Sequence, residues 1–221
     1  MLIELKNVTK CYPHCVSLSD INMSVNGGQF VAITGESGSG KSTLLSVMSG
    51  LNKPTSGSVL VNDRDLYSLS DKELSAFRNH KIGFIFQNFF LAPEYTVIQN
   101  VELPLLIGGM KSELSDKCER ELKNVGLWEK RNEKISALSG GEKQRCAFAR
   151  AMVSNPDIIF ADEPCGNLDS KNREVLMGYF KGKHEEGKTI ILVTHNIEET
   201  VFCDRIITLK DGRILSDVYR G

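Results

Sequence analysis

The chain has 221 residues, and its 27 Lys and Arg against 28 Asp and Glu leave a formal net charge of −1. This length fits one large α/β domain, or one domain with an inserted subdomain, and it suffices for a real core. The balanced charge shows no basic footprint, so we expect no nucleic-acid partner. No stretch approaches the roughly 20 apolar residues that are needed to cross a bilayer.

The cysteines and the N-terminus predict the compartment. Six cysteines are spread along the chain without a C-x-x-C pair, which in a chain of this size indicates free thiols in a reducing compartment. Cys11, His14 and Cys15 could be imagined as metal ligands, but no second cluster completes a zinc site. Met1–Lys6 lacks the basic start and the apolar block of a signal peptide. We therefore expect a cytoplasmic protein.

The first predicted elements are strands. Ile3–Val8 has a strand pattern, and Ile21–Val25 alternates with period two before a turn at residues 26–28. Phe30–Ile33 is apolar without alternation, which is the pattern of a strand covered on both faces. A helix is expected from Thr43 onward.

A glycine-rich loop lies between that last strand and the helix, and it matches the phosphate-binding pattern G-x-x-x-x-G-K-[ST]. The loop residues are Gly35, Glu36, Ser37, Gly38, Ser39, Gly40, Lys41 and Ser42. Glycines let successive backbone N–H groups point at one anion at the positive end of a helix. Lys41 can reach the β- and γ-phosphates, and the Ser42 hydroxyl can ligate Mg²⁺. The chain is therefore predicted to bind a nucleoside triphosphate.

The chain then continues with a strand, a short helix and another strand. Val59–Val61 is the first strand, and Ser70 with Glu73 forms a capping box for the helix. Ile82–Phe86 is the second strand, and it ends at Gln87.

From Asn88 the pattern becomes helical. Val97–Ile107 and Leu114–Val125 are helical stretches separated by glycines. We interpret residues 88–154 as an inserted helical subdomain, and residues 1–87 and 155–221 as the core of a single domain.

Strands and helices alternate again after the insertion. Ile158–Ala161 and Thr189–Val193 are strands, Ser170–Glu186 is a helix, and Ile206–Val218 is a hairpin. The fold class is therefore α/β: a phosphate-loop core with a mainly parallel sheet and an antiparallel portion at the N-terminus.

Two carboxylates end the strand at Ile158–Ala161. In a parallel sheet the carboxyl ends of the strands line the ligand crevice. Asp162 is then expected beside the phosphate loop, where it orients Mg²⁺, and Glu163 is expected to polarise the attacking water as general base. The alternative is a strand that runs into a solvated acidic turn.

Leu138–Glu142 opens another helix. Ser139 with Glu142 is a capping box, so one interpretation is a well-capped helix start. Gly140 and Gly141 directly after the cap lower helix stability, but they clear the N-terminus for the close approach of a phosphate.

These residues resemble an ATP-binding-cassette (ABC) ATPase over nearly the whole chain. The stretches that carry the resemblance are Gly35–Ser42, Gln87, Leu138–Glu142, Asp162–Glu163, Asn167–Asp169 and His195. The Leu-Ser-Gly-Gly-Glu signature separates this family from other phosphate-loop proteins. The resemblance implies a head-to-tail dimer, in which Ser139, Gly140 and Gly141 of one copy complete the ATP site of the other.

The resemblance also implies roles for single residues. Tyr12 matches the aromatic residue that stacks on adenine, and Thr43 adjoins the phosphate loop. Gln87 matches the glutamine that touches Mg²⁺ and senses a membrane partner. Asp169 matches the aspartate of the loop that crosses the dimer interface, and His195 matches the switch histidine that contacts the γ-phosphate.

The leading functional interpretation is the ATPase subunit of a transporter, bound on the inner face of the membrane to a separate permease. The permease is expected to dock near Gln87 and residues 88–109. Residues 166–169, Gly-Asn-Leu-Asp, resemble the subgroup for lipoprotein release and for macrolide and antimicrobial-peptide export. The alternatives are a soluble non-transport ABC ATPase acting on ribosomes or DNA, and a small-molecule kinase, which would not explain Leu138–Glu142.

Two local expectations complete the sequence analysis. Of the apolar residues after Gln87, we expect most to be core and two or three to be exposed. These residues are Phe89, Phe90, Leu91, Tyr95, Leu105, Leu106 and Ile107. Cys165 stands where Thr or Ser is commoner in the family, and we expect it near the nucleotide, either as a reactive thiol or as an inert buried one.

Overall fold

The structure is a computed structural model that describes residues 2–110 and 114–220. Within these residues, a six-stranded sheet has the order β10-β9-β3-β8-β7-β6, and a four-stranded sheet has the order β2-β1-β4-β5. The larger sheet is parallel except for β10, which pairs antiparallel with β9, and the smaller sheet is antiparallel. The predicted α/β fold class is confirmed.

The strands alternate with helices along most of the chain. The strands are β1 Ile3–Tyr12, β2 Cys15–Val25, β3 Phe30–Thr34, β4 Ser56–Val61, β5 Arg64–Asp65, β6 Ile82–Phe86, β7 Ile158–Asp162, β8 Thr189–Val193, β9 Arg205–Lys210 and β10 Arg213–Tyr219. The α-helices are α1 Lys41–Met48, α2 Asp71–Lys81, α3 Val97–Ile107, α4 Leu114–Asn124, α5 Gly140–Met152 and α6 Ser170–Glu185. The 3₁₀ turns are η1 Leu66–Ser68, η3 Trp128–Lys130, η4 Ile135–Ala137 and η5 Ile197–Phe202.

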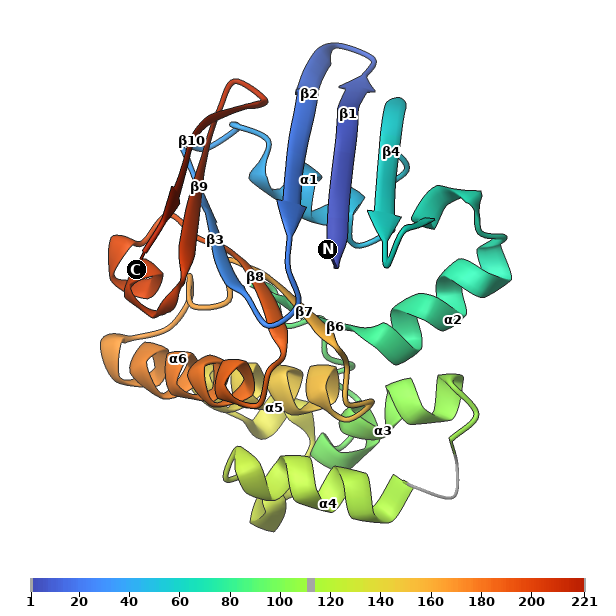
Figure 1. Cartoon of the computed structure of the whole chain (residues 1–221). Coiled ribbons are helices and arrows are strands. Elements are labelled where there is room, and N and C mark those ends of the chain that lie inside the picture. Colours follow the sequence, from blue (N-terminus) through green and yellow to red (C-terminus); the bar gives the residue numbers. More distant parts are fainter. Residues whose placement is uncertain (1, 111–113, 221) are drawn as a thin grey trace.

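The larger sheet lies between two layers. Figure 1 shows the smaller sheet and α1 on one side of it, and α3 to α6 on the other. Along β3, Phe30 and Ala32 belong to the core beneath the sheet, whereas Val31 and Ile33 belong to the core above it. A strand with a core on each face needs apolar residues at every position. This explains the continuous apolar run from which β3 was predicted.

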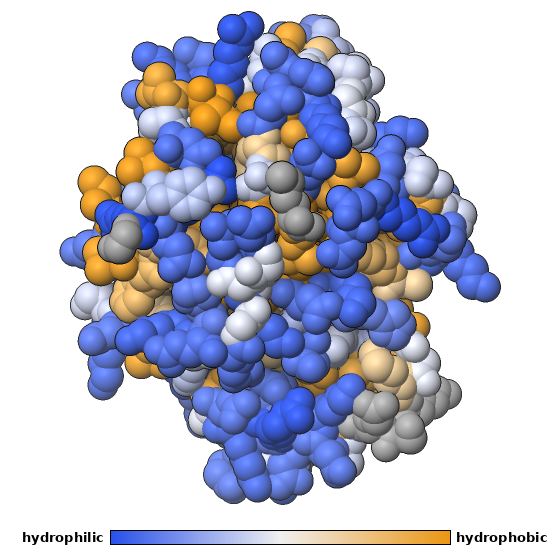
Figure 2. Space-filling view, viewed as in Figure 1, coloured by the Kyte–Doolittle hydropathy of each residue, from blue (hydrophilic) through white to orange (hydrophobic). Residues whose placement is uncertain are grey.

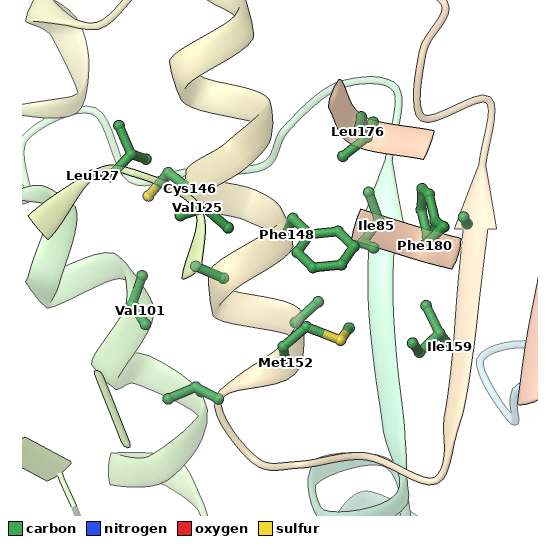
Figure 3. Packing of buried hydrophobic residues seen from close by; sticks show 14 of the residues in the cluster. Ile85, Val101, Val125, Leu127, Cys146, Phe148, Met152, Ile159, Leu176 and Phe180 are labelled. Atoms are coloured by element: carbon green, nitrogen blue, oxygen red, sulfur yellow. The ribbon is translucent and has the colours of Figure 1, made fainter. Parts of the chain in front are cut away.

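Helix α5 joins the predicted insertion to the sheet. In Figure 3 its Cys146 lies toward Val125 and Leu127, while its Phe148 lies toward Ile85 and Phe180. These side chains belong to one buried cluster beneath the sheet. Because α5 shares the core of the sheet, the border of the insertion at residue 154 stays a prediction.

The first two strands are longer than predicted. They form one hairpin in which Tyr12 pairs with Cys15, so residues 12–18 are not an open loop. Register shifts interrupt the pairing of β1, and Asn7 lies near one of them with a φ of +51°. Such irregularities break the period-two pattern on which the sequence prediction depended.

Within the part of the chain that the structure describes, capping boxes open α2, α3 and α5. Those at Ser70–Glu73 and Ser139–Glu142 were predicted, and the structure adds one at Thr96–Gln99. In each box the side chain of the N-cap residue accepts a hydrogen bond from the backbone N–H three residues later. The side chain of that later residue accepts a hydrogen bond from the backbone N–H of the N-cap residue.

The surface is mainly hydrophilic in the view of Figure 2. Hydrophobic atoms reach the surface over the β9–β10 hairpin, where Leu215 and Val218 are exposed. Among the helices of the described residues, none is long and apolar enough to span a bilayer.

The cap of α5 predicts a pH dependence of stability. Glu142 accepts from Lys130 Nζ at 2.8 Å and from the Ser139 backbone at 2.9 Å, and these contacts lower its pKa from 4.5 to about 2. Between these values the unfolded state binds a proton that the folded state does not. The contribution of Glu142 to the free energy of unfolding should therefore be fully present above about pH 4.5 and should be lost as the pH falls toward about 2.

Urea unfolding at pH 3 to 7 measures this contribution. Glu142→Gln should unfold with a shallower pH dependence than the wild type below pH 4.5, and Lys130→Gln should lose part of the same dependence. An identical acid limb in the wild type and Glu142→Gln would contradict the assignment.

Candidate active site

The phosphate loop is held by backbone from two other segments. Gly35 has a φ of +142°, and a Cβ there would lie 2.2 Å from the Leu209 carbonyl oxygen. Gly40 has a φ of +102°, and its Cβ would lie 2.4 Å from the Ser17 carbonyl oxygen. No L side chain fits either position, so both glycines are required by close backbone approach.

The loop opens into a small pocket. The pocket has a volume of about 220 Å³ and is lined by Ser17, Ser37, Gly38, Gly40, Lys41, Ser42, Thr43 and Glu163. Gly40 caps α1 without a side chain, so no side-chain cap competes for the N–H groups of its first turn. Such a helix start favours an anion.

Lys41 supplies the positive charge of the loop. Its side chain is 7% exposed, and Nζ donates to the carbonyl oxygens of Gly35 at 2.9 Å and Glu36 at 2.8 Å. The ammonium group is therefore held across the loop, beside the pocket that it lines.

A hydroxyl and a carboxylate meet at the edge of the pocket. Ser42 Oγ donates to Asp162 Oδ1 at 3.1 Å. Burial raises the pKa of Asp162, as does the neighbouring Glu163 carboxylate, while Ser42 and Lys41 act in the opposite direction. Serine hydroxyl and aspartate oxygens are the donors that Mg²⁺ prefers beside a phosphate. The residues present therefore fit this cation.

Glu163 has an unusual backbone. Its φ of +45° lies in the left-handed region, where a non-glycine residue costs about 1–3 kcal/mol. Its N–H donates to the Val193 carbonyl at 2.9 Å, and its Oε2 lies 3.2 Å from His195 Nδ1. The turn thus places the carboxylate in the wall of the pocket and next to His195. The sequence motif contained no sign of this strained conformation.

Gln87 lies beside the turn after Glu163. Its N–H donates to the Asp162 carbonyl at 2.9 Å, and its own carbonyl accepts from Asn167 Nδ2 at 3.3 Å. A Cβ on Gly166 would lie 2.7 Å from Gln87 Nε2. Gln87 does not line the pocket, so its contact with Mg²⁺ stays a prediction.

The signature residues lie outside the pocket. Ser139 caps α5, and a Cβ on Gly140 would meet no atom within 4 Å. Gly141, in contrast, packs against Asn172, whose Oδ1 would lie 2.3 Å from an added Cβ. The chain alone does not bring Ser139, Gly140 and Gly141 to its own phosphate loop.

Tyr12 also lies outside the pocket. Its side chain is 41% exposed, its hydroxyl accepts from Asn52 Nδ2 at 2.7 Å, and Lys10 Nζ lies 5.3 Å from the ring centroid. Stacking on adenine stays a prediction.

Ser17 lines the pocket and donates to Thr43 Oγ1 at 2.8 Å. The sequence analysis missed it, because a serine within a strand belongs to no motif.

The expectation for the residues after Gln87 was wrong. Among the seven apolar residues named there, all of which the structure describes, four are exposed: Phe90, Tyr95, Leu106 and Ile107. Only Leu105 is fully buried. More of these apolar side chains are exposed to solvent than would be expected if they formed the core of the subdomain.

The comparisons with known proteins agree with this geometry. The family model described as ABC transporter matches residues 18–166. The chain is 46% identical over 223 residues to the ABC transporter ATP-binding protein MJ0796 of Methanocaldococcus jannaschii, covering 96% of this chain and 95% of that protein. A dimeric MJ0796 structure in a post-hydrolysis state, bound to ADP and Pi, matches with a TM-score of 0.92 and 42% identity over 100% of both chains.

Two further relatives carry transport names. The lipoprotein-releasing system ATP-binding protein LolD of Geobacter metallireducens is 42% identical over 222 residues, which are 98% of this chain and 99% of LolD. The macrolide export protein MacB of Chlorobaculum tepidum is 40% identical over 220 residues. These are 98% of this chain but 34% of MacB, so the chain spans about a third of that relative. The chain belongs to the ABC transporter family, and the predicted resemblance is confirmed.

The buried position of Cys165 predicts its reactivity. It is 1% exposed, and burial raises its pKa, assisted by the Glu199 carboxylate, so we expect the inert thiol of the two alternatives. Cys118, Cys146 and Cys203 are also buried, with pKa values raised to about 12, whereas Cys11 and Cys15 are exposed.

A thiol titration of the native protein measures this difference. An aromatic disulfide reagent should modify Cys11 and Cys15 rapidly and the other thiols only after denaturation. A variant with Cys11→Ser and Cys15→Ser should then show no fast phase. A fast phase that persists in this variant and disappears on adding Cys165→Ser would show that Cys165 is reactive.

Proposed function

We propose that this chain is the ATP-binding and ATP-hydrolysing subunit of a transporter and that it powers a separate membrane permease. The observation that carries the proposal is the convergence of Lys41, Ser42 and Glu163 on one pocket, with Asp162 and His195 in contact with them. These groups come from three neighbouring strands whose carboxyl ends meet at the same edge of the sheet.

Each residue has a role that follows from its position. The phosphate loop and Lys41 bind the β- and γ-phosphates of ATP, and Ser42 and Asp162 hold Mg²⁺. The bound cation neutralises charge on the phosphates. Glu163 accepts the proton of the attacking water, and His195, 3.2 Å from it, orients this carboxylate and reaches the γ-phosphate.

The second half of the site comes from a second copy of the chain. Ser139, Gly140 and Gly141 lie at the start of α5, with open space at Gly140, and they do not reach the pocket of their own chain. The dimeric structure of MJ0796 supports the pairing of two copies. In the proposed head-to-tail pair, this helix start faces the other copy's phosphates.

The permease is proposed to dock next to Gln87. A groove of about 500 Å³ is lined by residues of α2, β6, α3 and α5, among them Phe84, Phe86, Leu103 and the 77% exposed Ile107. An exposed apolar groove of this kind fits an apolar segment of a partner. Through that partner the chain would lie on the inner face of the membrane.

Arg150 connects this groove to the segment after Gln87. It lines the groove, and its guanidinium donates to the backbone carbonyls of Phe89, at 2.8 Å, and Phe90. Phe90 has a φ of +48°, and its ring packs edge-on against the ring of Phe86, with 5.2 Å between the ring centroids. The groove wall is therefore joined to the last turns of α5.

We propose that the cargo is a lipoprotein, a peptide or a drug that is exported or extracted. The name of LolD, a lipoprotein-releasing system, and that of MacB, a macrolide export protein, support the first and the last of these. The alternative, a non-transport ATPase acting on ribosomes or DNA, is less well supported, because a net charge of −1 gives no general sign of a nucleic-acid partner.

Replacing Lys41 tests the phosphate loop. Lys41→Ala removes the cation beside the pocket, so ATP hydrolysis should fall by about 10²–10³-fold and ATP binding should weaken. Phosphate release and nucleotide titration measure the two effects, with the exposed Lys72→Ala on α2 as the matched control. Unchanged turnover in Lys41→Ala would disprove the assignment of the loop.

Replacing Glu163 tests the mechanism and the assembly together. Glu163→Gln keeps the shape but loses the base, so turnover should fall by about 10²–10⁴-fold while ATP stays bound. ATP that is not hydrolysed stays bound between two copies of the chain and shifts the monomer–dimer equilibrium toward the dimer by mass action. The variant should therefore elute as a dimer with Mg-ATP and as a monomer with ADP. Adding Ser139→Arg should abolish the dimer.

Two outcomes of that experiment separate the claims. Hydrolysis by Glu163→Gln at the wild-type rate would refute the base. A monomer in saturating Mg-ATP would refute dimer formation by this chain alone, and repeating the elution with the permease present would then test whether the permease brings the pair together.

A further inference from the structure

Asn172, in the first turn of α6, is a side chain that the mechanism above does not use. Its backbone N–H donates to Asp169 Oδ1 at 2.8 Å, as expected between a helix and its N-cap residue. Its side chain adds to this contact, because Nδ2 donates to Asp169 Oδ1 and Oδ2, each at 3.0 Å. These bonds lower the pKa of the Asp169 carboxyl. The carboxylate of Asp169 is therefore held by both the backbone and the side chain of a single residue.

The same side-chain amide lies against the start of α5. A Cβ on Gly141 would lie 2.3 Å from Asn172 Oδ1, 2.6 Å from its Cγ and 3.0 Å from its Nδ2. Gly141 is buried, whereas a Cβ on the preceding Gly140 would meet no atom within 4 Å. Arg145, one turn further along α5, donates from Nη1 to Asn172 Oδ1 at 3.4 Å. Asn172 thus contacts α5 at Gly141 and at Arg145.

Charged partners on both sides fix the orientation of this amide. The NH₂ group of Asn172 faces the Asp169 carboxylate, and its oxygen faces the Arg145 guanidinium. A flipped amide would turn its oxygen toward the carboxylate and its NH₂ group toward the guanidinium, so both contacts would be repulsive. Hydrogen bonds to charged groups are also stronger than those between neutral groups. The amide is therefore held over Gly141 and is not free to swing aside.

The two segments that Asn172 joins are those that the proposed dimer presents to the second copy. The start of α5, Ser139–Gly141, is proposed to face the other copy's phosphates, and Asp169 matches the family's aspartate at the dimer interface. Neither segment lines the pocket of its own chain. A surface that is ordered before association loses less entropy when it binds. A side chain that holds both segments together would therefore favour the pair.

We propose that Asn172 is a positioning residue that holds Gly141 and Asp169 as one preorganised surface for the second copy of the chain. Asn172 does not line the phosphate pocket, so it acts on the assembly of the ATP-bound pair and not on the binding of phosphate by one copy. This inference rests on the proposed function, because only the ATP-bound pair uses that surface.

The experiment measures dimer formation by the full chain in the Glu163→Gln background, with Mg-ATP as the probe. Asn172→Ala removes the amide but keeps the backbone N–H that Asp169 accepts, so α6 keeps its cap. The dissociation constant of the dimer should rise by about 10-fold or more, as expected for the loss of hydrogen bonds to charged groups. Sedimentation over a range of chain concentrations measures this constant. Nucleotide titration of the dilute, monomeric chain should give an ATP affinity within about 2-fold of the parent.

Asn172→Asp separates the hydrogen bond from the volume of the side chain. The carboxylate has nearly the shape of the amide, but it cannot donate to Asp169 and it places a second negative charge beside it. A negative charge in the first turn of α6 favours the helix. Thermal unfolding should therefore show a stability close to that of the parent, while the dimer is weakened at least as much as by Asn172→Ala. A residue with only a structural role would not weaken the dimer without lowering stability.

Asn124→Ala is the matched control. Asn124 is the last residue of α4, is exposed, and also donates to a carboxylate, that of Glu121, at 3.4 Å. Its replacement should leave the dissociation constant of the dimer unchanged. If thermal unfolding shows that Asn172→Ala does not fold, Asn172→Asp decides the question.

The outcomes distinguish the two proposals. A Glu163→Gln chain that stays monomeric in saturating Mg-ATP, both alone and with the permease, overturns the proposed pair and the role of Asn172 together. If Glu163→Gln forms the dimer, an unchanged dissociation constant in either Asn172 variant overturns only the role of Asn172. An equal weakening by Asn124→Ala, or an equal loss of ATP affinity in the monomer, does the same.

Discussion

The site depends on the close approach of two backbone segments, β2 and the β9–β10 hairpin, to the phosphate loop. The β9–β10 hairpin supplies Gly212, whose N–H donates to the Ser39 carbonyl at 3.1 Å and whose carbonyl accepts from the Ser19 N–H at 2.8 Å. One residue, Gly212, therefore ties the loop to the smaller sheet. Together with the contacts at Gly35 and Gly40, this leaves the loop little freedom, so the start of α1 is preorganised for an anion before one arrives.

The parallel sheet converts that fixed loop into a catalytic arrangement. Because β3, β8 and β7 are adjacent and in register, the residues that follow them emerge side by side. Asp162 thereby meets Ser42, and Glu163 meets His195, although 120 residues separate the first pair in the chain. The strained turn at Glu163 is the local cost of aiming the carboxylate into the pocket.

Much of this could be predicted from the sequence, because the signals were local. The continuous apolar run at β3 identified a strand covered on both faces, and the boxes at Ser70 and Ser139 placed two helix starts correctly. What could not be predicted depends on contacts between distant segments. The positive φ of Glu163 and the place of Ser17 in the pocket have no signature in the neighbouring residues. The share of exposed residues among the seven apolar ones after Gln87 was underestimated, because apolarity alone does not distinguish a buried side chain from an exposed one.

Helix α5 has a mechanical consequence. Arg150, near one end, is bonded to the backbone of Phe89 and Phe90, and Ser139 caps the other end, 11 residues away. At 1.5 Å per residue these points are about 16 Å apart on a rigid rod. Phe148, two residues before Arg150, packs against Ile85 and Phe180 and fixes this end of the helix beneath the sheet. We therefore expect a displacement of the groove wall to tilt the far end of this helix, without any side chain of the groove touching a nucleotide.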